Sequence, residues 1–546
     1  MKKSPFFSTV FLLVFAAAAC VAAMGIVHSA AAADHPYGGV MVVGWTQEPK
    51  HLFPSMEATI QAGMLHRAGL YETLVGFSPD LKPVPFLAKS WQTEDGGKKW
   101  IFNLVDKAKW HDGKPLTAAD VKFTIEYVKK NQLSSAVPYV ADISRVEAPD
   151  DTTVEVYYDE PIAAVLSNFQ YLYILPQAHF KNITGEAALS YTNPNPVGSG
   201  PFRFVNWKKS SEIVLKANED YWQGRPYLDM VIFKYYNNKN SLLLALKSGE
   251  IHAIPWEISV IAAEELKKTD SIKVSVDENI YYRWINFNVS DFGQQNPTLR
   301  DRSVRLALNH AIDRPYLCEL IHSGYVTPGV QIVQPSLKLW FNKALQPYAF
   351  NLKLANDILD KAGYTDKDAD GVRKSKDGVR LEYDVLTLQR FPEEVRAAEH
   401  IRGTWEKIGV KLNIQVVDGA TILSKLFPNY EQDMYLWGFD GRPDPTFILG
   451  LTTTAQIQNY NGAGYSNPVF DALYELQKKT TDLKRRQYIV GRMQSILHED
   501  APHAVLYNMS SIAAYNANKF DGFVRMPTGT FSNLNAFSLK SVYELK

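Results

Sequence analysis

The chain has 546 residues, of which 46% are hydrophobic and 21% are charged. This composition is typical of a folded globular protein, and the length exceeds what one hydrophobic core supports, so we expect several domain-sized units. Lysine plus arginine and aspartate plus glutamate both number 58. This balance argues against a nucleic-acid-binding protein, which needs a basic surface.

The N-terminus has the pattern of an export signal. Lys2 and Lys3 precede an apolar run that begins at Phe6, and four consecutive alanines end at Ala33. A basic start, an apolar centre and a small-residue cleavage site are the three parts of a secretory signal peptide. We therefore predict that residues 1–33 are removed on export.

Two alternatives to this cleavage stay open. The apolar run is long enough to remain as a membrane anchor. An A-A-A-C string, a poor lipobox, would make Cys20 a lipid-bearing N-terminus. Cleavage at the alanines leaves Cys318 as the last cysteine, so the exported chain would contain no internal disulfide.

The first predicted strand, 40–45, is a short apolar segment. The loop that follows it, 46–54, contains Glu48, two prolines and mixed polar residues. In open α/β domains, ligand contacts come from the loops that leave strand ends. Glu48 is therefore a candidate ligand-binding residue.

The stretch 91–128 has the clearest local structure. Residues 100–105 alternate with the period of two that a strand requires, and a His-Asp-Gly turn follows. Thr117 is placed to cap a helix, with Asp120 as the acidic partner of a capping box. Nothing in this stretch has a catalytic pattern.

The same stretch resembles a known family. Its run D-G-G-K-K-W-x-F-x-L, followed by K-W-H-D-G-x-P-L-T-A-x-D-V-x-F, is similar to the signature region of extracellular solute-binding protein family 5, the large periplasmic binding proteins of ABC importers. The resemblance implies an α/β, two-lobed periplasmic-binding-protein fold (type II, cluster C) with an accessory domain in the first lobe. It also implies a periplasmic location, an inner-membrane ABC permease as partner, no cofactor, and binding without catalysis.

This resemblance also suggests how the chain is divided. Lobe I is expected at 34–72, 190–290 and 508–546, with the accessory domain at 73–189. Lobe II is expected at 291–507. The chain would then cross between the lobes twice.

Local signals predict further elements after the accessory domain. Gly198 and Gly200 indicate a tight turn before a strand, since the P-loop string does not occur. The other expected elements are a strand at 202–205, a helix capped by Ser241 and ended by Gly249, a strand at 281–288, a helix at 304–312, a helix at 395–408 and a strand at 410–416.

The strongest candidate for ligand binding is Asp440. It follows the apolar strand 434–439 and precedes Gly441 and two prolines that end the strand. In peptide-binding members of the family, a Trp-x-x-Asp stretch supplies the aspartate that pairs with the peptide ammonium group, and Trp437 and Asp440 match it. One extra residue separates Asp440 from the Asp-Pro pair at Asp444, so Asp444 is the alternative. A second alternative is that Asp440 caps a turn and binds no ligand.

Arg390 is the second candidate. It lies just past the strand 381–388 and before a helix, where it can reach the same cleft. Dipeptide-binding members of the family have a similar Gln-Arg pair whose arginine binds the peptide carboxylate, and a guanidinium fork suits that geometry. The loop after Arg390 is shorter here, and an ordinary surface arginine is the alternative.

A later acidic segment has the D-x-D-x-D-G spacing of a calcium loop. It contains Asp366, Asp368 and Asp370, and Asp377 stands at the last ligand position. That position is usually a glutamate, and Lys374 occupies another ligand position. We therefore favour an acidic turn and keep a structural Ca²⁺ site as the alternative.

The remaining candidates are aromatic. Trp437, Tyr460 and Tyr465 either stack on a ligand or fill the interior. The sequence contains no H-E-x-x-H, cysteine cluster or G-x-S-x-G, so no enzyme motif or metal centre is indicated. A secreted carboxylate-pair hydrolase stays an alternative, because acidic pairs occur by chance in a chain of this length.

Together these patterns predict an exported, monomeric receptor whose two lobes close on a small amphoteric ligand, which we expect to be a peptide. Alternative cargoes are a nickel complex, an opine, an oligosaccharide or glutathione. A peptide chaperone or sensor is a further alternative from another class.

Overall fold

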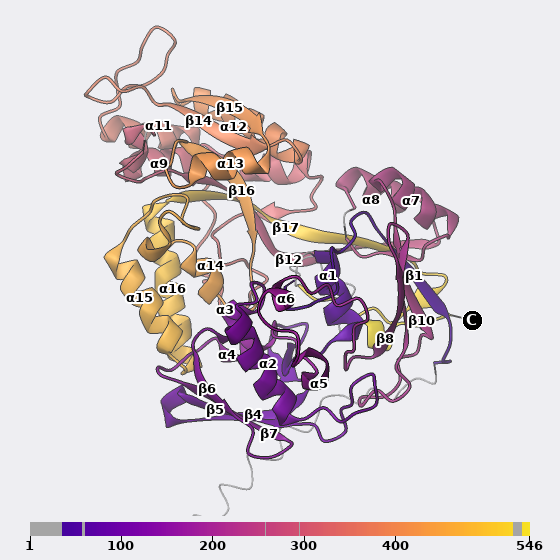
Figure 1. Cartoon of the computed structure of the whole chain (residues 1–546). Coiled ribbons are helices and arrows are strands. Elements are labelled where there is room, and N and C mark those ends of the chain that lie inside the picture. The colour runs from indigo at the N-terminus through magenta and orange to yellow at the C-terminus, as the bar shows by residue number, and fades with distance from the viewer. Residues whose placement is uncertain are drawn as a thin grey trace, which may run out of the picture.

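Figure 1 shows the computed structural model of the chain, which describes residues 35–56, 60–256, 258–293, 295–527, 535 and 538–545. The predicted signal peptide and the alternative lipid site Cys20 lie outside the described residues. Within the described part, no helix is long and apolar enough to cross a membrane. Cys318 is a buried free thiol.

An eleven-stranded sheet extends through both halves of the molecule. In spatial order its strands are β15 (Lys411–Val417), β14 (Glu382–Leu388), β16 (Met434–Asp440), β12 (Ile272–Phe287), β17 (His503–Asn516), β11 (Ala253–Ile254), β1 (Val40–Trp45), β10 (Met230–Tyr235), β9 (Glu212–Ala217) and β8 (Phe202–Lys208), and β13 (Thr327–Pro328) pairs with β17.

The strands β12 and β17 join the two ends of this sheet. Their antiparallel pairing runs from Ile272 opposite Asn516 to Asn286 opposite His503. β16 pairs only with the second part of β12, from Tyr281 onward, whereas β11 pairs with the last part of β17. Each half of the molecule therefore uses a different part of the same two strands.

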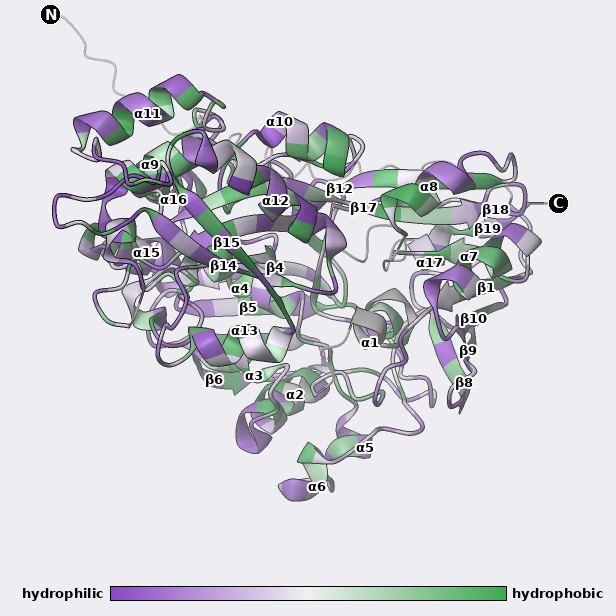
Figure 2. Cartoon of the chain, turned by 90° about the horizontal axis from the view of Figure 1, so that it is seen from above, coloured by the Kyte–Doolittle hydropathy of each residue, from purple (hydrophilic) through white to green (hydrophobic). Residues whose placement is uncertain are grey.

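The pairing of β12 with β17 is irregular in its middle. The register shifts between Glu278 and Tyr282, and again one residue later. Such bulges bend strands and increase their twist. In Figures 1 and 2, both strands run side by side from the region of α12 (Pro392–Glu406) to that of α8 (Val260–Leu266).

The half that contains β1 also holds a smaller antiparallel sheet of four strands. Its order is β4 (Ala88–Glu94), β5 (Lys99–Leu104), β7 (Thr153–Tyr158) and β6 (Ile143–Glu147). The other elements of this half are α1 (Ile60–Leu65), η1 (His66–Leu70), β2 (Val75–Phe77), β3 (Pro83–Pro85), η2 (Asp95–Gly97), α2 (Ala118–Asn131), α3 (Val137–Val140), α4 (Val165–Phe169), α5 (Gln177–Phe180), α6 (Glu186–Leu189), α7 (Lys239–Ser248), β18 (Phe520–Asp521), α17 (Ser538–Ser541) and β19 (Tyr543–Glu544). One continuous apolar core joins the smaller sheet to β1 and β10.

The predicted capping box at the start of α2 is confirmed. The backbone N–H of Thr117 donates to Asp120 Oδ2 at 3.0 Å. Asp120 also accepts hydrogen bonds from the indole of Trp110 at 3.2 Å and from the N–H of Gln177 at 2.9 Å. One buried carboxylate therefore ties the helix start to two distant segments.

The other half of the molecule packs helices on both faces of β12 and β16. On one face, Ile285 and Leu436 contact a core that includes α9 and α12. On the opposite face, Trp284 belongs to a core with α14, α15 and α16. The remaining bounds are η3 (Pro297–Arg300), α9 (Arg302–His310), α10 (Arg314–Tyr316), η4 (Leu317–Ile321), α11 (Leu352–Lys361), α13 (Gly419–Leu426), α14 (Thr446–Gly450), η5 (Thr454–Gln456), α15 (Pro468–Lys479) and α16 (Leu483–Asp500).

The prediction that Ser241 caps a helix is wrong. α7 begins three residues earlier than expected, and the side chain of Asn238 is the cap, accepting a hydrogen bond from the N–H of Ser241 at 2.9 Å. Asparagine and serine are both favourable N-caps, so the sequence alone did not decide between them. Gly249 ends this helix with φ of +78°, as expected for a C-terminal glycine.

A buried histidine makes the stability of the protein depend on pH. Burial lowers the pKa of His503, the first residue of β17, from 6.5 to about 3. Near pH 6.5 the unfolded chain takes up a proton that the folded chain does not, so this contribution to stability is complete above that pH and is lost as the pH falls.

We therefore expect His503→Asn to reduce the loss of unfolding free energy between about pH 7 and about pH 5 by roughly 2 kcal/mol. Urea denaturation followed by tryptophan fluorescence measures this loss in both proteins. An equal loss in the variant and the parent would contradict the assignment of this pH dependence to His503.

Candidate functional site

Asp440 is the last residue of β16, where this strand reaches the irregular middle of β12. It lies opposite Tyr281 in the strand pairing and is exposed. The next residue, Gly441, donates its N–H to the carbonyl of Ile280 at 2.6 Å. The strand therefore ends where predicted and presents a carboxylate beside the link between the two halves.

Next to Asp440 lies a buried ion pair that the sequence analysis did not identify. Arg283 follows Tyr281 on the same face of β12, and its Nε lies 2.7 Å from Oε1 of Glu394 in the first turn of α12. The two residues are only 4% and 2% exposed. The guanidinium of Arg283 also lies 4.7 Å from the ring centre of Tyr281 and 4.2 Å from that of Phe391.

Glu394 titrates unusually in this environment. Burial raises its pKa to about 7, and the charges of Arg283 and Arg390 oppose that rise. An Arg–Glu pair with little water around it is costly to assemble and still more costly to break. The pair therefore holds the start of α12, and with it the loop that carries Arg390, against β12.

The structure brings Arg390 and Asp440 to the same neighbourhood. Arg390 is exposed in the turn before α12, with its guanidinium 4.9 Å from the ring of Phe391. Burial raises the pKa of Tyr281 to about 12; Arg283 and Arg390 lower it, whereas Asp440 raises it. The charges of Arg390 and Asp440, the two predicted ligand-binding residues, therefore both affect the pKa of Tyr281.

Trp437 also belongs to this region but faces the other side of β16. It is half-buried and packs at the edge of the core formed by Leu386, Leu388 and Tyr435. Alternation along the strand places it opposite in direction to Asp440. The Trp-x-x-Asp spacing therefore does not put both side chains on one face.

Glu48 lies in the other half of the molecule and is engaged in local structure. Its Oε1 accepts hydrogen bonds from the indole of Trp207 at 2.6 Å and from the N–H of Ser210 at 2.9 Å. These partners lie at the end of β8 and in the turn after it. The structure does not bring Glu48 beside Asp440.

Tyr460 and Tyr465 lie toward the opposite end of β16 from Asp440. The hydroxyl of Tyr430, which precedes β16, donates to the carbonyl of Asn461 at 2.6 Å. Tyr460 is 52% exposed, whereas Tyr465 is buried and donates to Asp500 at 2.5 Å. Tyr465 therefore fills the interior, and Tyr460 is separated from Asp440 by the length of the strand.

Asp444, the alternative to Asp440, is committed to a structural contact. Its two carboxylate oxygens lie 2.6 and 2.7 Å from the guanidinium of Arg486. Burial would raise the pKa of Asp444, but the charge and hydrogen bonds of Arg486 hold it below its usual value. A fully engaged, buried carboxylate is poorly placed to bind a ligand.

The acidic segment forms turns whose carboxylates pair with an arginine. Asp368 and Asp370 lie 3.0 and 3.3 Å from the guanidinium of Arg380, and Asp368 also accepts two backbone N–H groups. In the described residues, no group of three or more His, Cys, Asp or Glu side chains could hold a metal ion. Arg380 therefore already pairs with two of the four predicted calcium ligands, and the Ca²⁺ alternative with Asp366 and Asp377 stays a prediction.

A second unpredicted contact links the segment after β16 to the helical part of the first half. The guanidinium of Arg442 lies 5.2 Å from the ring centre of Tyr139 and 5.1 Å from that of Tyr171, two rings that are stacked 5.4 Å apart. Phe447 lies 4.4 Å from the same guanidinium. A cation over aromatic rings is attracted by their negative faces, so Arg442 joins the two halves.

Other contacts across the same boundary support this one. The N–H of Ala163 donates to the carbonyl of Lys478 at 2.8 Å, and Lys479 lies 3.5 Å from Glu160. The two halves are therefore connected both by β12 with β17 and by this separate group of contacts.

A sheet shared by two halves through β12 and β17 is the architecture of a two-lobed protein. Residues 82–459 match the model of the family described as bacterial extracellular solute-binding proteins, family 5 Middle. The chain belongs to this family of extracellular solute-binding proteins. The resemblance seen in the sequence is thereby confirmed.

Individual relatives match nearly the whole chain. It is 27% identical to the oligopeptide-binding protein AppA of Bacillus subtilis, with 92% of each protein covered. It is 25% identical to the dipeptide-binding protein of Escherichia coli, with 84% of this chain and 87% of that protein covered. Both relatives are named as peptide-binding proteins.

Solved structures confirm the fold class. The periplasmic binding protein DppA of Helicobacter pylori, in complex with the peptide STSA, has a TM-score of 0.73 at 25% identity and covers 94% of this chain and 99% of that one. AppA of Bacillus subtilis, in complex with a nonapeptide, has the same TM-score and identity over 94% and 100% of the two chains. The expected α/β, two-lobed, type II periplasmic-binding-protein fold is therefore confirmed.

Proposed function

We propose that this chain is the substrate-binding protein of an ABC importer and that it captures peptides in the periplasm for a permease of the inner membrane. The observation that carries the proposal is the position of Asp440 and Arg390, opposite charges around Tyr281 at the end of β16. Relatives named for oligopeptide and dipeptide binding, and two matched structures in complex with peptides, support the same cargo.

In this proposal each end of the peptide meets a fixed charge. Asp440 binds the ammonium group, and Arg390 binds the carboxylate through its guanidinium fork. Exclusion of water strengthens both interactions. Because the ends and the backbone supply most of the contacts, the side chains of the peptide are loosely specified and the protein accepts many sequences.

Three further residues belong to the proposed ligand contacts. Trp437 flanks the strand end that carries Asp440 but faces its other side. Glu48 contributes from the first lobe only through the oxygen that Trp207 does not occupy. Tyr460 would meet only a cargo that extends along β16.

Hinge closure is the proposed mechanism of capture. β12 and β17 are the strands that both halves share, and the register shift after Glu278 gives a place for bending. The ligand shifts the population to the closed state when it binds that state, in which it contacts both lobes, more tightly than it binds the open state. The lobe boundaries proposed are 34–72, 190–290 and 508–546 for lobe I, with 73–189 as accessory domain and 291–507 as lobe II.

The remaining parts of the proposal follow from the family. Export through the signal peptide 1–33 would release the protein into the periplasm, where it acts as a monomer without cofactor or catalysis. The free thiol of Cys318 is buried, which fits a protein that folds without disulfides.

The cargo can be identified by native mass spectrometry of protein purified without denaturation. We expect a mixture of peptides, because a site that holds the two ends tolerates many side chains. A single nickel complex, opine, oligosaccharide or glutathione would overturn the peptide assignment. Release of cleaved peptide from the protein would indicate a hydrolase instead.

Asp440→Ala should weaken peptide binding by more than about tenfold, the effect of losing one charge-assisted contact of about 1.4 kcal/mol. Titration calorimetry measures the affinity, and the melting temperature should change little because Asp440 is exposed. Asp106→Ala, another exposed carboxylate, is the matched control and should bind as the parent does. Unchanged affinity in Asp440→Ala would remove this residue from the site.

Arg442→Ala should weaken peptide binding without touching the peptide, because we infer that its contact with Tyr139 and Tyr171 stabilises the closed arrangement. Loss of two cation–π contacts of about 0.5–1 kcal/mol each predicts roughly a five- to thirtyfold lower affinity. Small-angle scattering should show a more extended protein at limiting peptide. Arg442→Lys keeps the charge and should lose less; parental affinity and scattering in Arg442→Ala would contradict the inference.

A further inference from the structure

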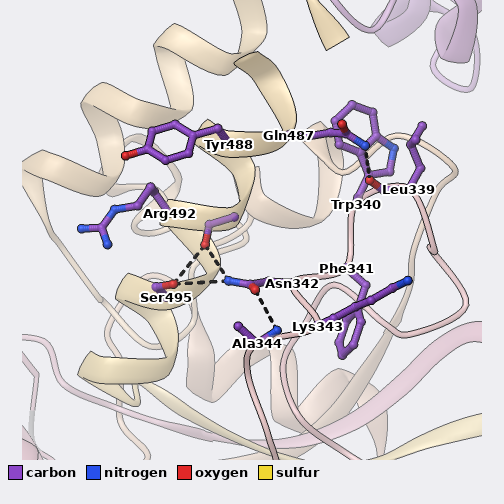
Figure 3. Close-up of a pocket in the computed structure, with 11 residues that line it drawn as sticks. Leu339, Trp340, Phe341, Asn342, Lys343, Ala344, Gln487, Tyr488, Arg492 and Ser495 are labelled. Carbon is purple, nitrogen blue, oxygen red and sulfur yellow. Dashed lines mark hydrogen bonds between the residues drawn. The ribbon is translucent and has the colours of Figure 1, made fainter. Parts of the chain in front are cut away.

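A groove lies on the outer side of α16, away from Asp440 and Arg390. One wall is the helix, and the other is the loop 339–344, which precedes α11 (Figure 3). Its volume is about 550 Å³, and its lining includes Leu339, Asn342, Lys343, Gln487, Tyr488 and Arg492.

Hydrogen bonds fix the loop on the helix. The side chain of Asn342 donates to the carbonyl of Gly491 at 3.2 Å, and its backbone N–H donates to Gln494 Oε1 at 2.9 Å. The amides of Gln487 and Gln494 donate to the carbonyls of Leu339 and Trp340, each at 2.8 Å. The groove is therefore preformed and needs little ordering when a partner binds.

The groove is positively charged. None of its lining residues is acidic, and in Figure 3 Arg492 projects from the helix while Lys343 projects from the loop. Lys338, Lys484 and Arg485 are exposed neighbours of the lining residues in the sequence. None of these five cations forms an ion pair with a carboxylate in the described part of the chain. We call this set the cationic groove.

The cationic groove also exposes apolar surface. Tyr488 is 71% exposed and Leu339 is 37% exposed, and Tyr488 and Arg492 project from the same side of the helix (Figure 3). A small molecule would be poorly covered in so open a groove, because small-ligand pockets bury most of their ligand. Tyrosine and arginine are instead the side chains most enriched where proteins bind one another.

We propose that the cationic groove is a docking surface for an acidic segment of the membrane permease that receives the cargo. The whole chain has equal numbers of acidic and basic residues, so a groove lined by Lys343 and Arg492 and by no acidic residue favours an anionic partner. A concave groove fits a protruding segment better than a flat lipid surface. The inference rests on the proposed function, since it names the partner of that function.

The test compares two charge-reversal variants of the full-length protein in cells that lack the parental copy. Lys343→Glu with Arg492→Glu reverses two charges of the cationic groove. Arg402→Glu with Lys407→Glu reverses two exposed charges at the end of α12 and is the matched control. Uptake of a labelled peptide is measured in cells, and peptide affinity is measured by calorimetry on the purified proteins.

We expect the groove variant to bind peptide within about twofold of the parent and to support uptake at least about tenfold more slowly, since charge complementarity governs association and specificity. The control should match the parent in both measurements. Peptide uptake at the parental rate in cells with the groove variant would overturn the docking site. Failure of the parent itself to bind peptide would overturn the proposed function instead, which separates the two conclusions.

Flotation with vesicles of phosphatidylethanolamine and phosphatidylglycerol tests the other anionic partner. We expect the parent not to float with these vesicles. Flotation of the parent that is lost in the groove variant would show that the cationic groove binds the lipid surface, and would overturn the assignment to the permease.

Discussion

The pairing of β12 with β17 is the constraint on which the rest of this structure depends. These two strands are shared by both halves of the sheet, so neither half can be displaced without bending them. Their pairing is regular at both ends and shifts register in the middle, between Glu278 and Tyr282. The weakest part of the pairing therefore lies where the halves meet, and the charged residues of the candidate site lie beside it.

The ion pair of Arg283 with Glu394 connects this strand pair to the site. It attaches the start of α12 to β12 through two buried charges, and the turn just before α12 carries Arg390. Because breaking a buried pair costs far more than breaking an exposed one, the position of Arg390 relative to Asp440 is fixed by groups that touch no ligand. The distance between the two proposed ligand charges is thus a property of the fold.

Local features of this structure could be read from the sequence, and long-range ones could not. The capping box of Thr117 and Asp120 and the end of β16 at Asp440 each depend on neighbours within a few residues. The aromatic contacts of Arg442 depend on Tyr139 and Tyr171, which precede it by about half of the chain. The strand expected at 281–288 captured only part of β12, although Ile272, Val274 and Val276 alternate with polar residues in its first half, because the polar run 277–279 interrupts that pattern.

The partners that a charged side chain has within the folded protein distinguish structural charges from candidate ligand-binding ones. Asp444 and Glu48 were reasonable ligand candidates by position, yet Arg486 holds both oxygens of Asp444 and Trp207 holds one of Glu48. Arg390, in contrast, forms no ion pair with a carboxylate in the described residues, although it lies beside a buried glutamate. A sequence shows where a charge stands along a strand or loop, but only the folded chain shows whether another residue has already neutralised it. A cation that the fold leaves without an anion is the one that remains available to a ligand or a partner.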